Sequence, residues 1–226
     1  MSARRRHALA VAGLAVAGLA MLLTGCGDDE VADTPASCSD TVASDPEHLG
    51  VEVVRTLERA PDSYTQGLVM VDGRLFESGG RYGESSLREL DPETGEVLRQ
   101  EAVDDELFAE GLANGGDGTL VQLTWKEGTA LVWNADSFEL ERELTYDGEG
   151  WGLTTLEDGT LVMSNGSDVL VERDPEDFSI ERELRVGRAD GGADLLNELE
   201  FDGTSIWANR YTTDELLRIE PECATV

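Results

Sequence analysis

Four Asp-Gly stretches set the fold of this chain: VDGRLFES at 71–78, GDGTLVQL at 116–123, EDGTLVMS at 157–164 and FDGTSIWA at 201–208. Their glycines, at positions 73, 118, 159 and 203, are 45, 41 and 44 residues apart. Asp-Gly followed by apolar residues is typical of a tight hairpin between two β-strands. The chain therefore contains an internal repeat built on hairpins.

A second kind of turn recurs in phase with the first. It reads DPETG at 91–95, NADSF at 134–138, DPEDF at 174–178 and EPECA at 220–224. Each unit then consists of four short antiparallel strands, which is typical of a propeller blade. The sequence predicts an all-β fold, a β-propeller of four-stranded antiparallel blades with about four blades present. A plain β-sandwich with coincidental turns is the alternative.

The composition excludes several classes of function. The chain has 226 residues, 48 Asp and Glu against 17 Lys and Arg, and a formal charge of −31. So negative a protein is a poor partner for nucleic acid, because phosphate binding needs clusters of Lys and Arg. The only histidines are His7 and His48, which argues against a Ser-His-Asp triad or a His-rich zinc centre. We expect a monomer with no metal and no cofactor.

The N-terminus has the pattern of an export signal. Arg4, Arg5 and Arg6 precede an apolar run of 16 residues at 8–23, which is short for a membrane-spanning helix. The run ends in Leu23-Thr24-Gly25-Cys26, which resembles a bacterial lipobox. An ordinary secretory signal with an incidental cysteine is the alternative. We expect cleavage before Cys26, lipidation of its thiol, and anchoring to the outer face of the bacterial cytoplasmic membrane.

The predicted domain organisation follows from this signal. Residues 1–25 are the lipoprotein signal peptide, and 26–50 are the lipidated cysteine followed by an acidic tether without periodicity. Residues 51–226 form the propeller. Within it, 51–59 (VEVVRTLER) resembles the repeats' outer strands. We expect 51–59 to be an outer closing strand; whether it leaves a gap beside the fourth blade or closes a four-bladed ring stays open, and the gap is favoured.

The repeat also predicts a site. The innermost strands of a propeller begin at one mouth of its central channel, and here they begin with TQGL at 65–68, AEGL at 109–112, GWGL at 150–153 and LNEL at 196–199. Aligned, the equivalent positions hold Gln66, Glu110, Trp151 and Asn197. The second strands end nearby in Trp125, Asn165 and Tyr211. Aromatic side chains around a few polar groups are the general form of a small-ligand pocket.

Eight motifs in order carry a resemblance to a known family: YTQGL (64–68), ESGGRYGESSL (77–87), FAEGL (108–112), LTWKEG (123–128), EGWGLT (149–154), MSNGS (163–167), LNELE (196–200) and WANRYTTDELLRI (207–219). Together they resemble the plant and bacterial type of glutaminyl-peptide cyclotransferase, the glutamine cyclotransferase family. The resemblance covers residues 51–222. It implies a five-bladed propeller that needs no zinc.

The resemblance implies an activity on peptides or proteins with an N-terminal glutamine, which become pyroglutamyl peptides with release of ammonia. It implies that Glu110 is the acid/base. Gln66 and Asn197 match the family's polar pocket residues, and Trp125 and Trp151 match its aromatic walls. Three further positions differ mildly from the family pattern: Tyr64, where Phe is usual, Tyr211, where Trp is common, and Asn165, where Asp is usual.

The chemistry fits this set of residues. The α-amine attacks the side-chain carboxamide of the same residue, so the effective concentration is high. A single carboxylate such as Glu110 can take a proton from the amine and give one to the leaving ammonia. Its pKa must rise for that, which water exclusion by tryptophans would achieve. Amide donors such as Gln66 and Asn197 can stabilise the oxyanion.

One departure from the family is large. The family continues for another blade that carries a pocket lysine, whereas the only lysine here, Lys126, belongs to the LTWKEG motif. We therefore expect a chain truncated at the C-terminus, with the last blade incomplete. A lipid-anchored binding propeller without chemistry and an inactive fragment of the enzyme are the alternative functions.

The two cysteines other than Cys26 are expected to pair. An exported protein meets an oxidising compartment, where an even number of cysteines favours a disulfide. Cys38 lies in the tether and Cys223 lies in the last of the second turns. Two free thiols are the alternative.

Overall fold

The computed structural model describes residues 46–57, 60–188 and 191–226, all of which lie in the compact unit Val31–Val226. These residues form strands and no helix, so none of them makes a helix that could span a membrane. The signal segment, Cys26 and Cys38 lie outside the described residues.

Three four-stranded antiparallel sheets form the first three blades, each with its strands in chain order. Blade 1 consists of β1 (Thr65–Val71), β2 (Arg74–Gly79), β3 (Ser86–Leu90) and β4 (Val97–Ala102). Blade 2 consists of β5 (Ala109–Gly116), β6 (Thr119–Thr124), β7 (Thr129–Asn134) and β8 (Leu140–Thr145). Blade 3 consists of β9 (Leu153–Thr155), β10 (Leu161–Met163), β11 (Val169–Arg173) and β12 (Ile180–Arg185).

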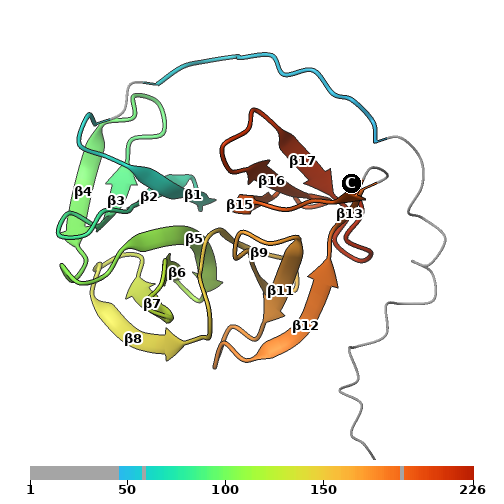
Figure 1. Cartoon of the computed structure of the whole chain (residues 1–226). Helices are drawn as coiled ribbons and strands as arrows, with labels where there is room; N and C mark the ends of the chain where they lie inside the picture. The colour runs from blue at the N-terminus through green and yellow to red at the C-terminus, as the bar shows by residue number, and fades with distance from the viewer. Residues whose placement is uncertain (1–45, 58–59, 189–190) are drawn as a thin grey trace, which may run out of the picture. The chain divides into compact units, whose positions relative to one another are not determined.

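Blade 4 has three strands among the described residues: β15 (Leu196–Phe201), β16 (Ile206–Arg210) and β17 (Leu216–Ile219). A two-stranded hairpin of β13 (Gly187–Arg188) and β14 (Gly191–Gly192) connects it to blade 3. Figure 1 shows the blades around a common centre, with β1, β5, β9 and β15 innermost. The prediction of an all-β propeller with four blades is confirmed.

The two kinds of turn have the roles that the repeat predicts. Asp72 and Gly73 connect β1 to β2 with φ values of 51° and 79°, the left-handed pair that matches the twist of a hairpin. Between β3 and β4, Oδ1 of Asp91 accepts hydrogen bonds from the backbone N–H groups of Glu93 and Thr94, each at 2.8 Å. Asn134 and Asp174 make the same turn in the next two blades.

The inner strands pack against one another through glycines. The N–H of Gly111 on β5 donates to the carbonyl of Trp151 at 2.7 Å. A Cβ on Gly111 would lie 2.5 Å from the nitrogen of Leu153, and one on Gly152 would lie 2.0 Å from the carbonyl oxygen of Asn197. Only glycine permits backbones to approach so closely.

The hydrophobic core is divided into clusters that lie between neighbouring blades. Phe76, Leu87, Leu112 and Leu120 belong to the cluster between blades 1 and 2. The cluster between blades 2 and 3 contains Leu123, Leu153, Met163 and Phe178, and the one between blades 3 and 4 contains Val162, Leu170, Leu199 and Ile206. Each fully buried side chain of this size stabilises the fold by about 1.5–3 kcal/mol. Apolar packing therefore holds each described blade to the next one along the chain.

Arginines join each outer strand to the second turn of the next blade. The guanidinium groups of Arg99 on β4 and Arg142 on β8 each donate to two backbone carbonyls of that turn. Arg182 on β12 donates to the carbonyl of Glu222. A planar fork can serve two carbonyls at once, which a lysine ammonium cannot do with fixed geometry.

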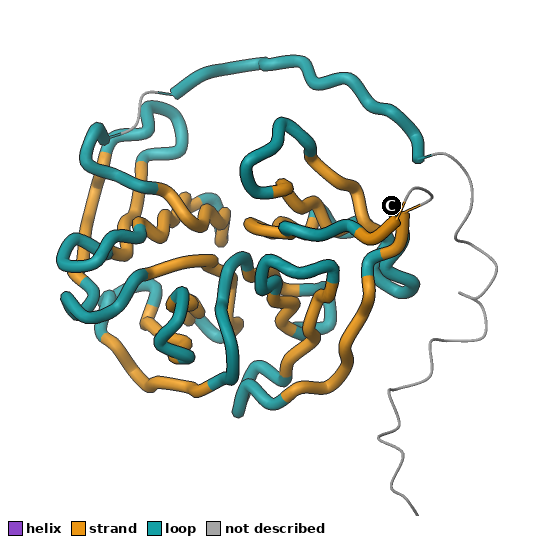
Figure 2. Tube along the Cα trace, viewed as in Figure 1, coloured by secondary structure: helices purple, strands orange, loops and turns teal. Residues whose placement is uncertain are grey.

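The prediction of a strand at 51–59 is wrong over the described part of that range, because residues 51–57 form no strand (Figure 2). Figure 1 shows segment 46–57 running between blades 4 and 1. Its ends are held by Glu47, which pairs with Arg218 at 2.8 Å, and by Arg55, which pairs with Glu93 and donates to the carbonyl of Pro92. Arg55 thus contacts the second turn of blade 1 in the same way that arginines on the outer strands contact this turn in the other blades. Unlike those arginines, Arg55 does not lie on a strand. No ladder joins 51–57 to β17.

Cys223 lies in the last of the second turns, where its backbone N–H donates to Oε2 of Glu220 at 2.7 Å. It is disulfide-bonded. Because Cys38 lies outside the described residues, the pairing of Cys38 with Cys223 stays a prediction.

Candidate functional site

A pocket of about 300 Å³ lies where the inner strands begin. Six of its residues stand at or just before the start of inner strands, and two follow second strands. The lining consists of Tyr64, Gln66, Phe108, Glu110, Trp125, Trp151, Asn197 and Tyr211. The structure therefore brings together every residue for which the sequence predicted a catalytic or substrate-binding role.

Irregular pairing aims the polar side chains into this pocket. The register of β1 against β2 shifts between Thr65 and Gly67, which encloses Gln66. Equivalent shifts enclose Glu110 on β5 and Asn197 on β15. A β-bulge redirects side chains that a regular strand would alternate between two faces.

Glu110 is the buried acid of the pocket, with 6% of its surface exposed. Burial raises its pKa to about 8. A hydrogen bond with the Gln66 side chain opposes this rise, and the negative charges of Glu127 and Glu149 add to it. Glu110 is therefore largely protonated at neutral pH, and it can both donate and accept a proton near that pH.

The aromatic walls form two pairs of edge-to-face rings. The ring centroids of Phe108 and Trp125 lie 5.7 Å apart, and those of Trp151 and Tyr211 lie 5.5 Å apart. Contacts of this geometry are favoured by the ring quadrupoles and hold the rings in fixed orientations. The polar groups of the pocket thus face an apolar enclosure.

Sequence reasoning missed Phe108 as a pocket residue. The signal was present, since Phe108 stands two residues before Glu110 as Tyr64 stands two residues before Gln66. Asn165, which the repeat placed near the pocket, instead accepts hydrogen bonds from the backbone N–H and the hydroxyl of Ser167 in its own turn. Lys126 does not line the pocket.

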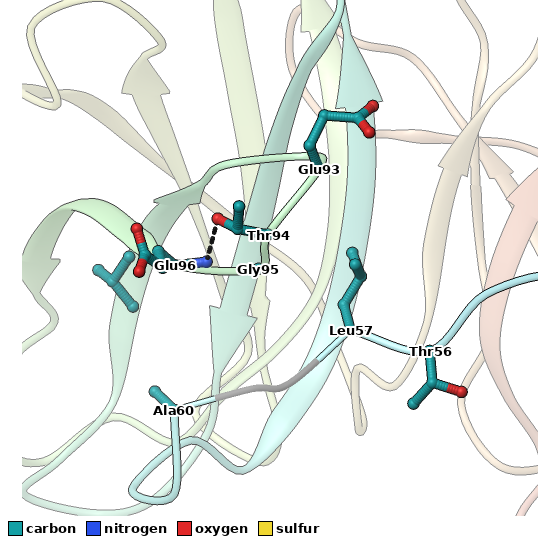
Figure 3. Close-up of a pocket in the computed structure, with 8 residues that line it drawn as sticks. Thr56, Leu57, Ala60, Glu93, Thr94, Gly95 and Glu96 are labelled. Carbon is teal, nitrogen blue, oxygen red and sulfur yellow. Dashed lines mark hydrogen bonds between the residues drawn. The ribbon is translucent and has the colours of Figure 1, made fainter.

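A larger hollow of about 590 Å³ lies between Thr56, Leu57 and Ala60 on one side and the second turn of blade 1 on the other (Figure 3). Its lining includes Leu57, Ala60 and the turn residues 93–97, among which Thr94 accepts a hydrogen bond from the backbone of Glu96. It has no aromatic residue and no buried acid, so we assign the candidate site to the smaller, aromatic pocket. Among the described residues no group of three His, Cys, Asp or Glu side chains is arranged to hold a metal ion.

A model of the glutamine cyclotransferase family matches residues 22–226. The chain belongs to this family. A glutaminyl-peptide cyclotransferase of Arabidopsis thaliana is 34% identical over 175 residues, which are 76% of this chain and 54% of the plant protein. The chain thus spans about half the length of that curated relative.

One solved structure agrees with the family assignment, and a second shares the fold. The crystal structure of Myxococcus xanthus glutaminyl cyclase superposes with a TM-score of 0.72 at 35% identity, over 77% of this chain and 73% of that one. The WD40 domain of Neurospora crassa Pan2 superposes with a TM-score of 0.50 at 15% identity, over 68% of this chain and 46% of that one. The second likeness shows the fold alone, as expected for another protein built of propeller blades.

Proposed function

We propose that this chain is a glutaminyl-peptide cyclotransferase, which converts the N-terminal glutamine of peptides or proteins to pyroglutamate and releases ammonia. The observation that carries the proposal is the buried carboxyl of Glu110, with a pKa of about 8, in an aromatic pocket of about 300 Å³. The family assignment and the relatives named above support the same reaction class.

The reaction needs one group that moves protons between two nitrogens. The α-amine attacks the carboxamide carbon, and its proton passes to the carboxylate form of Glu110. The resulting carboxylic acid gives a proton to the departing nitrogen, the carbon–nitrogen bond breaks, and ammonia leaves. The pKa of a peptide α-amine is about 7.7–8.0. The pKa of Glu110 is close to this value, so both its carboxyl and carboxylate forms are present in the pH range in which the amine becomes neutral and able to attack.

Gln66 and Asn197 supply the side-chain amides that stabilise the oxyanion of the tetrahedral intermediate. Both side chains line the pocket, and both are placed by a break in strand register. Preorganised donors in a site that excludes water stabilise developing charge more than water does. Trp125, Trp151 and Tyr211 exclude that water and hold the glutamine side chain.

The test is incubation with a synthetic peptide that begins with glutamine, following ammonia release and the loss of one ammonia from the peptide mass. The control is the same peptide with an acetylated α-amine, which cannot cyclise. We expect ammonia from the free peptide only. Binding of the free peptide without ammonia release above the uncatalysed rate would overturn the proposal.

We further propose that the chain works outside the cytoplasm, attached to the membrane by a lipid on Cys26. The lipobox-like sequence Leu23-Thr24-Gly25-Cys26 after an apolar run supports this, and more than one acyl chain gives stable anchoring. In a bacterial host, the wild-type chain should incorporate labelled palmitate and sediment with membranes, and Cys26→Ala should do neither. An unlabelled wild-type chain in the soluble fraction would contradict the anchor.

A further inference from the structure

Glu149 contacts both tryptophan walls of the pocket without lining the pocket itself. Its Oε2 accepts a hydrogen bond from Nε1 of Trp125 at 2.9 Å and another from Nε1 of Trp151 at 3.0 Å. The two indoles come from different blades, since Trp125 follows β6 and Trp151 precedes β9. One carboxylate oxygen therefore couples the ring orientations of two blades.

Lys126 completes this arrangement. Its Nζ lies 3.6 Å from the centroid of the Trp125 ring and 3.7 Å from Oε1 of Glu149. A cation over an indole face is attracted by the ring quadrupole, and the same charge here attracts the second carboxylate oxygen. The chain's only lysine thus binds both the acid and one of the rings that the acid holds.

The protein does not fully enclose these two rings. Trp125 and Trp151 are only partly buried, and each has one aromatic neighbour in the pocket. Gly166 lets the Trp151 indole lie directly against its backbone, because a Cβ at that position would lie 2.7 Å from Cζ2 of the ring. An indole has a single N–H donor, so a fixed acceptor selects one ring orientation among those that the packing permits.

We propose that Glu149 is a positioning residue of the glutamine pocket, which holds the Trp125 and Trp151 rings in the orientation that encloses the substrate, with Lys126 keeping its carboxylate in place. The kinetic consequences rest on the proposed function. The geometry of the indoles does not, so the two can be tested separately. The hydrogen bonds from the indoles and the neighbouring lysine also hold the pKa of Glu149 below its ordinary value, with the Trp151 bond the largest cause.

Glu127 provides a matched control. Its negative charge, like that of Glu149, raises the pKa of Glu110. However, its Oε1 accepts from the hydroxyl of Tyr82 at 2.7 Å, and its Oε2 accepts from backbone N–H groups rather than from an indole. Variants at Glu127 therefore report the effect of charge on Glu110 without releasing either tryptophan.

The kinetic experiment compares Glu149→Leu, Glu149→Gln and Glu127→Gln. Loss of two hydrogen bonds to a charged acceptor should lower kcat/KM of Glu149→Leu at least about tenfold, mostly through KM. Glu149→Gln keeps an acceptor oxygen and should stay within about threefold. Both Gln variants should move the pH profile of kcat/KM to lower pH alike, because each removes one negative charge near Glu110. Equal KM values for wild type and Glu149→Leu would overturn the proposal.

A second readout needs no activity. The chain has four tryptophans, and in ¹⁵N-labelled protein each gives one indole N–H signal. Two of the four signals should shift in Glu149→Leu and none of them should shift in Glu127→Gln.

If Glu149→Leu fails to fold, acid titration of the wild type replaces it. The same two signals should then move together, with one pKa below the ordinary value of a glutamate. The proposal would be overturned, even for an active enzyme, if no indole signal shifted in Glu149→Leu or in the acid titration. An inactive wild type whose two signals respond would instead contradict the proposed function and support the positioning role.

Discussion

Oε1 of Glu198 accepts a hydrogen bond from the backbone N–H of Leu68 at 3.1 Å, and this bond connects the inner strand of blade 4 to that of blade 1. Glu198 stands where the other inner strands carry glycine, as in Gly111 and Gly152. Between the other neighbouring inner strands, the glycine lets the two backbones approach closely. Between blades 4 and 1, the Glu198 side chain reaches across the space between the strands. The contact between blades 4 and 1 is therefore of a different kind from the other three.

We predict that Glu198→Ala lowers the free energy of unfolding by about 0.5–1.5 kcal/mol, because the hydrogen bond from the Leu68 N–H is lost. Glu198→Gln keeps an acceptor oxygen. Since burial raises the pKa of Glu198 well above its ordinary value, the neutral amide should be at least as stable as the wild type at pH 8. Urea denaturation measures both. The exposed Glu157→Ala is the control and should change stability by less than about 0.5 kcal/mol. If Glu198→Ala unfolded at the same urea concentration as the wild type, the hydrogen bond between Leu68 and Glu198 would not stabilise the contact between blades 4 and 1.

Replacement of the central acid should separate chemistry from folding. Glu110→Gln cannot exchange protons, so kcat should fall by about 10²–10⁴-fold. The amide has nearly the same size and stays within reach of Gln66, so the variant should fold and still bind a glutaminyl peptide. Ammonia release and isothermal titration calorimetry measure the two properties. Turnover close to that of the wild type would remove Glu110 from the mechanism.

The same substitution should change how stability depends on pH. Glu110 has a pKa of about 8 in the folded chain and about 4.3 when unfolded. Between these values the folded state holds a proton that the unfolded state has lost, so stability falls as pH rises, by up to about 1.4 kcal/mol per unit. The loss is complete above pH 8.

Glu110→Gln should lack this contribution. Denaturation midpoints at pH 5, 6.5 and 8 should therefore diverge progressively in favour of the variant. Glu198 and Glu200, whose pKa values burial also raises, are present in both proteins and cancel in the difference. Parallel pH curves for the two proteins would mean that Glu110 is not buried as the structure shows.

Close packing of the inner strands gives a further prediction. In Gly111→Ala the new Cβ would lie 2.5 Å from the nitrogen of Leu153 and 2.6 Å from the carbonyl oxygen of Trp151, so the backbone must move. We expect a loss of about 3 kcal/mol, or failure to fold. Gly50→Ala is the matched control, because no atom lies within 4 Å of the place that its new methyl group would take. Thermal denaturation compares the two variants, which should differ widely; equal melting temperatures would contradict the packing described.

Much of the site could be predicted because the fold is a repeat. Once the Asp-Gly turns fixed the register of the four units, Gln66, Glu110, Trp151 and Asn197 had to occupy equivalent places around one centre. The same alignment, which places Phe108 opposite Tyr64, would also have predicted Phe108 as a pocket residue. The sequence also indicated that Glu149 is a hydrogen-bond acceptor between blades, and the structure confirms this. Its two partners were not predictable, because nothing in the spacing of Trp125 and Trp151 specifies that both indoles reach the same oxygen.

The sequence alone determined the elements that depend on local chemistry. Asp-Gly dipeptides permit left-handed turns, Asp91 and its equivalents cap the second turns, and alternating apolar residues form the strands between them. The tertiary structure decided what depends on surroundings. Residues 51–57 resemble an outer strand, but a strand forms only where another offers its backbone hydrogen bonds, and no described strand does so there. The pKa of Glu110 is likewise a property of its enclosure, since water around the same carboxyl would leave it an ordinary acid.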